Sequence, residues 1–203
     1  MGYLVSVILG YLLGCSHMAF YISRLKKLDV RSSGSGNLGA SNVTVLFGWK
    51  AGVLTAVHDI LKAFLAVWLA KLLFPGLPYA GAVAGVASVL GHIFPFYLKF
   101  KGGKGLASYF GMTLALNWKL ALIVVAVILL ATVITDFISV GALSTIVVVP
   151  LYTGLTTHNP VLVGILCIGT AVMLYKHWEN ILRIARKEEI GLRSTLKGEK
   201  RVK

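Results

Sequence analysis

The sequence contains few charged residues and very few acidic ones. Only 13% of its 203 residues are charged and 7 are Asp or Glu, whereas 57% are hydrophobic and the mean hydropathy is +0.83. Too few polar side chains remain to cover a water-facing surface. We therefore predict an integral membrane protein, built as an all-α helical bundle.

Acidic residues and cysteines are too few and too scattered for a metal centre. The three aspartates, Asp29, Asp59 and Asp136, lie far apart, so the cluster of several Asp that binds metal in phosphatidyl transferases is missing. Cys15 and Cys167 lie in apolar runs without a Cys or His at ligand spacing. We expect no metal, no cofactor and two buried structural thiols.

Positive charge is plentiful but confined to a few segments. The 20 Lys and Arg give a formal net charge of +13. They form no basic stripe with interleaved aromatic residues, so nucleic-acid binding is not predicted. The charge indicates membrane orientation and anionic partners instead.

Apolar runs predict seven membrane spans, since a crossing needs about 20 residues. With the N-terminus outside, residues 23–50, 99–105, 135–137 and 176–203 lie inside and hold 17 of the 20 Lys and Arg, as the positive-inside rule requires. The run 106–118 is short, so six or eight crossings stay open as alternatives. The predicted spans are about 2–22, 51–74, 79–98, 106–118, 120–135, 137–155 and 161–175.

The C-terminus is then cytoplasmic. We interpret residues 1–203 as a single transmembrane catalytic domain with a basic tail from about 186 to 203, which rests on anionic lipid.

The first inner loop is rich in small hydrogen-bonding groups. Residues 32–42 read SSGSGNLGASN, with one large apolar side chain. Its hydroxyl, amide and N–H groups enter a helix predicted to begin near Ala40, which suits an anion at a helix N-terminus. The G-x-G-x-x-G pattern at 34–39 does not indicate a dinucleotide site, because no strand precedes it. The candidate binding residues are Ser35, Gly36, Asn37 and Asn42.

The second inner loop combines glycine with lysine. Residues 91–105 read GHIFPFYLKFKGGKG. Glycines without Cβ allow N–H groups to turn toward a phosphate, and the lysines add charge. The spacing excludes a Walker loop, and we interpret Lys99 as an interfacial anchor. The candidate residues are His92, Lys101, Gly102, Gly103, Lys104 and Gly105.

A third inner segment follows the last span. His177 and Asn180 lie three residues apart on one helix face, and Arg183 follows three residues later. One helix can thus present an imidazole, an amide and a guanidinium to one cavity. The alternative is an ordinary amphipathic helix in which Glu179 pairs with Arg183.

Two charges lie within the second span. Asp59 and Lys62 are three residues apart, and an unpaired charge near the bilayer centre costs about 2.5–3.5 kcal/mol. They should therefore face the bundle and pair, or lie shallow on the inner side, and either a structural pair or a substrate contact is open. His17, His58 and His158 are scattered and predict no shared site.

The three inner segments together resemble the signature motifs of the PlsY family, the bacterial acyl-phosphate:glycerol-3-phosphate acyltransferases. The resemblance runs through GSGNLGASNV at 34–43, GHIFP to FKGGKG at 91–105 and HWENILR at 177–183, and covers nearly the whole chain. It implies a seven-helix enzyme of the bacterial inner membrane with its active site on the cytoplasmic side. Such an enzyme moves a fatty acyl group from acyl phosphate to the 1-hydroxyl of glycerol 3-phosphate, giving 1-acyl-glycerol 3-phosphate and phosphate.

The chain departs from the family pattern at three places. Ser41 stands where the family commonly has Thr, which keeps the hydroxyl. Val45 stands where the family often has Arg, so a phosphate contact is lost if that Arg makes one. After Arg183 the family tends toward Gly-Thr-Glu, which residues 187–189, Lys-Glu-Glu, match only in part.

Acyl phosphate already carries a good leaving group, so the enzyme must chiefly align two phosphate-bearing substrates and stabilise an oxyanion. The His-x4-Asp motif of thioester-using acyltransferases is absent. We expect glycerol 3-phosphate, fatty acyl phosphate and membrane lipids as partners, and a monomer is compatible with the sequence. The alternative is an anion or phosphate-ester transporter. The predicted catalytic residues are Ser35, Lys104, His177 and Asn180, and the predicted binding residues are Gly36, Asn37, Asn42, His92, Lys101, Gly102, Gly103, Gly105 and Arg183.

Overall fold

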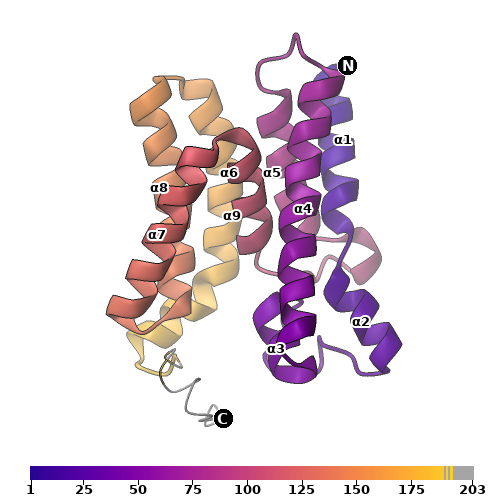
Figure 1. Ribbon diagram of the computed structural model, residues 1–203, viewed down its shortest axis with the longest axis vertical. Helices are drawn as coiled ribbons and strands as arrows, with labels where there is room; N and C mark the ends of the chain where they lie inside the picture. The colour runs from indigo at the N-terminus through magenta and orange to yellow at the C-terminus, as the bar shows by residue number, and fades with distance from the viewer. Residues whose placement is uncertain (190, 192, 194–203) are drawn as a thin grey trace. The chain divides into compact units, whose positions relative to one another are not determined.

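The computed structural model describes residues 1–189, 191 and 193. The chain forms two compact helical units, residues 1–118 and residues 119–203. The predicted all-helical membrane bundle is confirmed (Figure 1).

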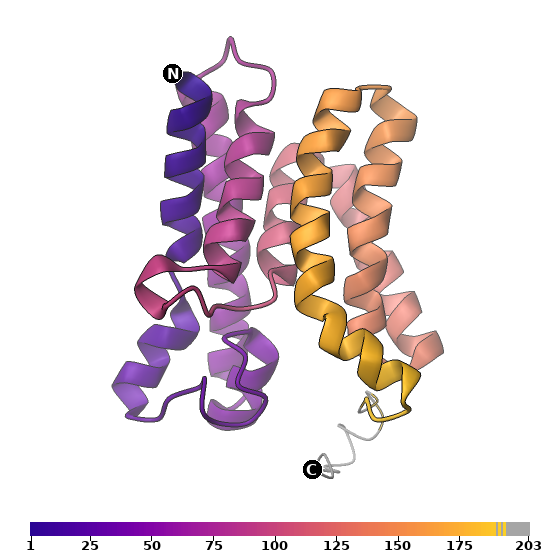
Figure 2. The same cartoon turned by 180° about the vertical axis from the view of Figure 1, so that it is seen from behind.

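The first unit is a bundle in which α1, α4, α5 and α6 pack together. Figure 2 shows α2, α3 and the loop between them at the end of this unit opposite Met1. Its elements are α1 (Gly2–Cys15), α2 (Met18–Lys26), α3 (Ala40–Phe47), α4 (Trp49–Leu73), α5 (Ala80–Ile93), the 3₁₀ turn η1 (Phe96–Leu98) and α6 (Leu106–Leu116).

Helix α5 lies at the centre of the first unit because it is built from small residues. Its sequence AGAVAGVASVLGHI is buried along nearly its whole length. Helix α1 approaches it so closely that a Cβ at Gly14 would collide with the carbonyl oxygen of Ser88. Small residues let helix backbones meet in this way inside membranes. This packing fixes the end of α5, where His92 lies.

The first predicted span is broken in the structure. Ser16 and His17 take extended backbone angles between α1 and α2. The break leaves carbonyl groups of α1 without helical partners, and side chains satisfy them, as the bilayer requires. His17 Nδ1 lies 2.6 Å from the oxygen of Cys15, which also accepts from the Tyr97 hydroxyl at 2.8 Å.

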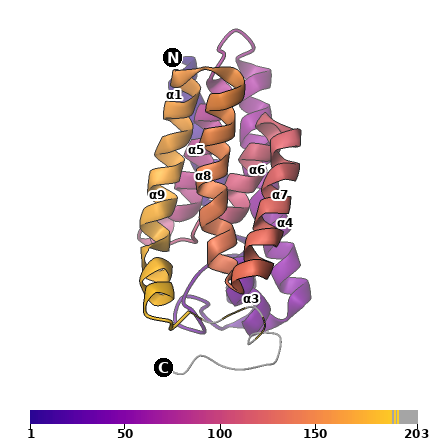
Figure 3. The same cartoon turned by 90° about the vertical axis from the view of Figure 1, so that its left-hand side faces the viewer.

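The second unit contains three consecutive helices, α7 (Trp118–Thr135, whose first residue still belongs to the first unit), α8 (Ile138–Thr157) and α9 (Pro160–Ala185). Figure 3 shows α8 and α9 side by side. Pro150 interrupts the hydrogen bonding of α8. The carbonyl of Ile146, four residues earlier, accepts a hydrogen bond of 3.1 Å from the Thr170 hydroxyl of α9, which ties these two helices together.

Six helical stretches in the described part of the chain are long and apolar enough to cross a membrane, with 18 to 26 residues each. The predicted span at 106–118 corresponds to α6, which has 11 residues. At about 1.5 Å per residue it covers about 17 Å of a core about 30 Å thick. Seven crossings and the orientation of the termini therefore stay predictions.

One thiol differs from its prediction. Cys15 is buried, as expected, but Cys167 is exposed on α9. The prediction that Cys167 is buried was wrong, because an apolar run in a spanning helix can face lipid instead of the protein core.

Candidate functional site

Asn42 organises the loop that precedes α3. Its amide nitrogen lies 3.1 Å from the carbonyl oxygens of Val30, Ser33 and Asn37. Its side-chain oxygen accepts the backbone N–H of Ser35 at 2.9 Å. Asn42 was predicted to bind substrate, but the nitrogen and oxygen of its buried side-chain amide already contact the loop itself.

The loop presents small polar groups around this amide. Helix α3 begins at Ala40, which confirms the predicted start, and Gly39 is its N-cap. Ser35 and Gly36 are exposed, and Asn37 is half-buried. A helix N-terminus carries backbone N–H groups and partial positive charge, so this end of α3 suits an anion.

The glycines of the second loop pack against the end of α5. The N–H of Gly102 donates to the oxygen of Ile93 at 3.0 Å, and the N–H of Gly103 donates to the oxygen of His92 at 3.1 Å. The prediction that these two N–H groups turn toward a phosphate was therefore wrong. A Cβ at Gly103 would collide with His92 Nε2, so the missing side chain permits close packing.

Lys104 follows this packed turn directly. Gly105 takes a left-handed conformation, with φ of 94°, and is the N-cap of α6. Lys104 is thus half-buried at the start of that helix, while Lys101 is exposed. The helix N-terminus and the lysine place positive charge at one point.

A buried ionic cluster, formed by Asp59 and Lys62, contacts the His92 ring. Lys62 Nζ lies 2.7 Å from Asp59 Oδ1 and 2.9 Å from His92 Nδ1, and it also donates to the Ser16 oxygen at 2.6 Å. Asp59, Lys62 and His92 are all buried. The pair faces the bundle interior, as predicted, and its contacts favour a structural pair over a substrate contact.

Two further histidines, His17 and His58, join this cluster, although their scattered positions in the chain predicted no shared site. His17 Nε2 lies 2.9 Å from the oxygen of His92, and the two rings stack with centroids 4.9 Å apart. His58 Nε2 lies 3.0 Å from the Ser16 hydroxyl. The break after α1 brings His17 here, and no local pattern predicts such a break.

The first two motifs are neighbours within the first unit. Val30, Leu38 and Val43 from the first loop and α3 share one buried apolar cluster with Leu98, which precedes the glycines. Figure 2 shows the loop between α2 and α3 and the loop between α5 and α6 toward the end of the unit opposite Met1.

The third motif lies on α9 in the second unit. His177 and Asn180 are both buried on one helix face, as predicted. His177 Nδ1 lies 2.8 Å from the Met173 oxygen, and Asn180 Nδ2 donates to Glu189 Oε1 at 2.7 Å. Arg183 Nε donates to Glu189 Oε2 at 2.6 Å, so Glu189, and not Glu179, is its ion-pair partner here.

Glu189 is the residue that the sequence reading missed. It falls within the segment interpreted as a basic tail on lipid, yet it folds back onto α9. Burial raises the pKa of Glu189, but hydrogen bonds from Arg183 and Asn180 outweigh this and lower the pKa below the ordinary 4.5. The carboxylate is charged at neutral pH and orients both side chains. The partial match of residues 187–189 to the family ending was the available signal.

The structure thus divides the predicted residues between its two units. The candidates at 35–42 and 92–105 belong to the first unit, and His177, Asn180 and Arg183 belong to the second. Within the described residues, His, Cys, Asp and Glu side chains form no group of three suited to a metal ion.

Comparison with known proteins gives one consistent result. A family model described as glycerol-3-phosphate acyltransferase matches residues 4–187. A glycerol-3-phosphate acyltransferase 1 from Oceanobacillus iheyensis is 35% identical over 206 residues, covering 96% of this chain and 97% of its own length. A glycerol-3-phosphate acyltransferase from Coxiella burnetii is 37% identical over 191 residues, covering 93% and 97%.

Two solved structures are also similar. Both are crystal structures of PlsY, an integral membrane glycerol 3-phosphate acyltransferase. The glycerol 3-phosphate form has a TM-score of 0.87 and 33% identity, covering 94% of this chain and 96% of that one. The lysophosphatidic acid form has a TM-score of 0.86 and 32% identity, covering 94% and 95%.

The hydrogen bonds from Asn180 and Arg183 to Glu189, here called the Glu189 clamp, predict that the end of α9 opens in a pH-dependent way. Because the folded pKa of Glu189 is lowered, its stabilisation is present above pH 4.5 and lost as the pH falls through the folded pKa. Glu189→Gln should speed hydrogen exchange at Arg186 and Glu188, whose N–H groups bond to Leu182 and Arg183. Loss of charge-assisted bonds worth about 1.5–3 kcal/mol corresponds to about ten-fold or more.

The measurement is hydrogen exchange by mass spectrometry from about pH 3 to about pH 7, a range that includes the ordinary pKa of a glutamate, corrected for intrinsic rates. The matched control is Glu188→Gln, whose side chain is exposed. Equal protection in both variants would contradict the clamp.

Proposed function

The chain belongs to the glycerol-3-phosphate acyltransferase family, and from this premise we propose that it transfers a fatty acyl group from acyl phosphate to the 1-hydroxyl of glycerol 3-phosphate. The products are 1-acyl-glycerol 3-phosphate and inorganic phosphate. The reaction takes place in the bacterial inner membrane, at its cytoplasmic face. Relatives named as acyltransferases disfavour the alternative of a phosphate-ester transporter.

The observation that carries this proposal is the rigid support behind both phosphate-suited loops. Asn42 fixes the loop that enters α3, and His92 fixes the loop that enters α6. Donors held in place before the substrate arrives lower the reorganisation that the reaction needs. Ser35 and Lys104 are the groups that we assign to the substrate phosphates.

This support changes the roles of three residues. Asn42, His92 and Gly103 act as positioning residues, because their polar or packed atoms contact the protein itself. Lys101 is exposed and adds positive charge near Lys104. Gly36, Asn37, Gly102 and Gly105 shape the same two loops.

The reaction itself is a displacement at the acyl carbon. The 1-hydroxyl oxygen bonds to that carbon, the carbon–oxygen bond to phosphate breaks, and inorganic phosphate leaves. A substrate phosphate oxygen accepts the hydroxyl proton. We assign His177 and Asn180 to orienting the hydroxyl or donating to the oxyanion, while Arg183 adds charge. Orientation of the substrates can lower the activation barrier by about 7–11 kcal/mol. A general base typically raises the rate ~10²–10⁴-fold, which is a smaller contribution.

The proposed topology has seven crossings with the N-terminus outside and the C-terminus in the cytoplasm. It counts α6 as a seventh, short crossing beside six longer helices. The confinement of 17 of 20 Lys and Arg to the predicted inner segments supports it. The acyl chain enters sideways from the lipid.

The donor is tested directly with purified protein and labelled glycerol 3-phosphate. We expect labelled 1-acyl-glycerol 3-phosphate with acyl phosphate and none with the matching acyl thioester. The chain has no His-x4-Asp motif to supply a general base, so acyl phosphate, which already carries a good leaving group, should be the better donor. Transfer from the thioester at an equal rate would refute the proposed donor, and no transfer from either would refute the proposed reaction.

Substitution of the assigned residues should lower turnover. Lys104→Ala and Asn180→Ala should each reduce kcat by about ten-fold or more, since each removes a donor from a charged transition state. Lys50→Ala and Glu179→Gln are the matched controls, because both side chains are exposed and neither is assigned to substrate. Near-normal turnover in a folded Lys104 or Asn180 variant would discard its role.

The departure at Val45 predicts a gain of affinity. Val45 lies on α3 with its side chain 74% exposed, so Val45→Arg needs no repacking. A charge-assisted bond of about 1.5–3 kcal/mol should lower the KM for glycerol 3-phosphate by about ten-fold at similar kcat. Val45→Met is the control for side-chain size. An unchanged KM would mean that position 45 does not face this phosphate.

A further inference from the structure

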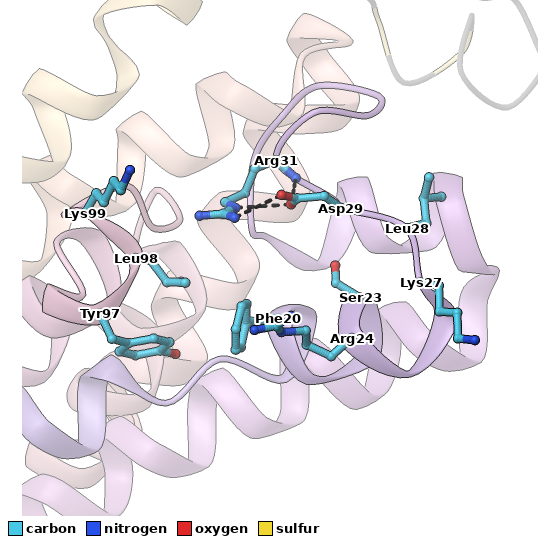
Figure 4. A pocket seen from close by; sticks show the side chains of 10 residues that line it. All are labelled: Phe20, Ser23, Arg24, Lys27, Leu28, Asp29, Arg31, Tyr97, Leu98 and Lys99. Atoms are coloured by element: carbon cyan, nitrogen blue, oxygen red, sulfur yellow. Dashed lines mark hydrogen bonds and ion pairs between the residues drawn. The ribbon is translucent and has the colours of Figure 1, made fainter.

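A basic cavity lies in the first unit, beside the second inner loop. It measures about 670 Å³ and lies between α2, the loop after it and η1. The residues that define its chemistry are Phe20, Arg24, Lys27, Arg31, Tyr97 and Lys99 (Figure 4). The proposed catalytic and binding residues do not appear among its lining residues.

The cavity has a strong excess of positive charge. Four cationic side chains line it, Arg24, Lys27, Arg31 and Lys99, and they face a single carboxylate, that of Asp29. Such an imbalance in one concave site favours an anionic occupant.

Two of the guanidinium groups are held in place before any ligand arrives. Arg31 donates to both oxygens of Asp29, at 3.1 and 2.9 Å. This hydrogen bonding lowers the pKa of Asp29 and raises the pKa of Arg31, so both groups stay charged. Arg24 lies over the Phe20 ring, with its central carbon 5.4 Å from the centroid. Fixed cations lose less side-chain entropy on binding an anion.

The surroundings of the cavity are apolar. Phe20, Tyr97 and Leu98 form its walls. Leu25, Phe96 and Phe100 are large apolar side chains on neighbouring segments and are exposed, Leu25 by 83%. Residues 2–26 form a candidate membrane span, so α2 belongs to the membrane-facing part of the chain. A cationic cavity beside exposed apolar side chains matches an amphiphile with a charged head group.

We propose that this cavity binds the phosphate head group of an anionic membrane phospholipid, separately from the substrates of acyl transfer. The guanidinium groups of Arg24 and Arg31 and the ammonium of Lys99 contact the phosphate. The acyl chains lie against the exposed apolar side chains. Anionic lipid surfaces attract such basic clusters by about 1 kcal/mol for each Lys or Arg.

The wall of the cavity is also connected to the first motif. The backbone N–H of Val30 donates to the Ser23 hydroxyl at 3.2 Å, which ties the loop to α2. Asn42 Nδ2 bonds to the carbonyl of the same Val30. The wall of the cavity is therefore continuous with the loop that carries Ser35.

Lipid binding to the full-length purified chain tests the proposal. Delipidated protein in neutral detergent is titrated with phosphatidylglycerol, with phosphatidylcholine of the same acyl chains and with inorganic phosphate, and native mass spectrometry counts bound lipid. The variants are Arg31→Gln with Lys99→Gln, and Arg24→Gln with Lys99→Gln, which leaves the Asp29–Arg31 pair intact. The control is Lys50→Gln with Arg186→Gln, which removes the same charge from exposed positions outside the cavity.

We expect phosphatidylglycerol to bind more tightly than phosphatidylcholine, and each cavity variant to lose about ten-fold or more of that affinity. The control should bind as the unchanged protein does. Equal binding of the two lipids, unchanged affinity in both cavity variants, or an equal loss in the control would overturn the proposal. Displacement of the lipid by inorganic phosphate at the lipid's own affinity would show a site for free phosphate, and would also overturn it. No substrate is present, so this result does not depend on acyl transfer.

Discussion

The ion pair between Asp59 and Lys62 is the interaction on which the rest of the first unit depends. Two charges in a membrane bundle are tolerated when they pair and when their remaining hydrogen-bonding groups are satisfied. The Lys62 ammonium meets this condition, because besides Asp59 it contacts His92 of α5 and the Ser16 carbonyl at the break after α1. Three parts of the chain are therefore fixed to one another by the need to leave no charge exposed to hydrocarbon. Removal of one member would leave the others uncompensated.

The same constraint reaches the loop before α6 through a single residue. The His92 ring is held by Lys62 on one side, while its Nε2 lies against Gly103 on the other. Its carbonyl accepts from the Gly103 N–H, and His17 Nε2 lies 2.9 Å from the same oxygen. Gly103 tolerates this contact because it has no side chain, so Lys104 begins α6 at a defined position. In the proposed phosphate site, the glycines therefore act by positioning Lys104, and not by offering the N–H groups of Gly102 and Gly103.

Some features of this protein could be predicted from sequence because they depend on local pattern. Composition gave the membrane bundle, small polar residues gave the start of α3 at Ala40, and helical spacing gave the shared face of His177 and Asn180. The break at Ser16 and His17 has no such pattern, because tertiary contacts to Lys62 and Tyr97 stabilise it. The roles of Asn42 and Glu189 were missed for the same reason, because their partners are distant in the sequence. Asn42 bonds to Val30, 12 residues earlier, and Glu189 folds back to Asn180 and Arg183, 9 and 6 residues earlier.

Asn42 and Glu189 show a common way of building a polar site in this chain. Each is a short side chain with several acceptor or donor positions, and each uses them on its own segment: Asn42 on the loop around Ser35, Glu189 on Asn180 and Arg183. A side chain whose polar atoms are taken up in this way has fewer left for substrate, but it fixes neighbours that can contact one. Signature motifs therefore mix two kinds of residue, those that touch a ligand and those that hold them. Spacing alone does not separate the two, because both kinds are small and polar. For Asn42 the structure separates them, because its side-chain nitrogen and oxygen both have partners within the loop.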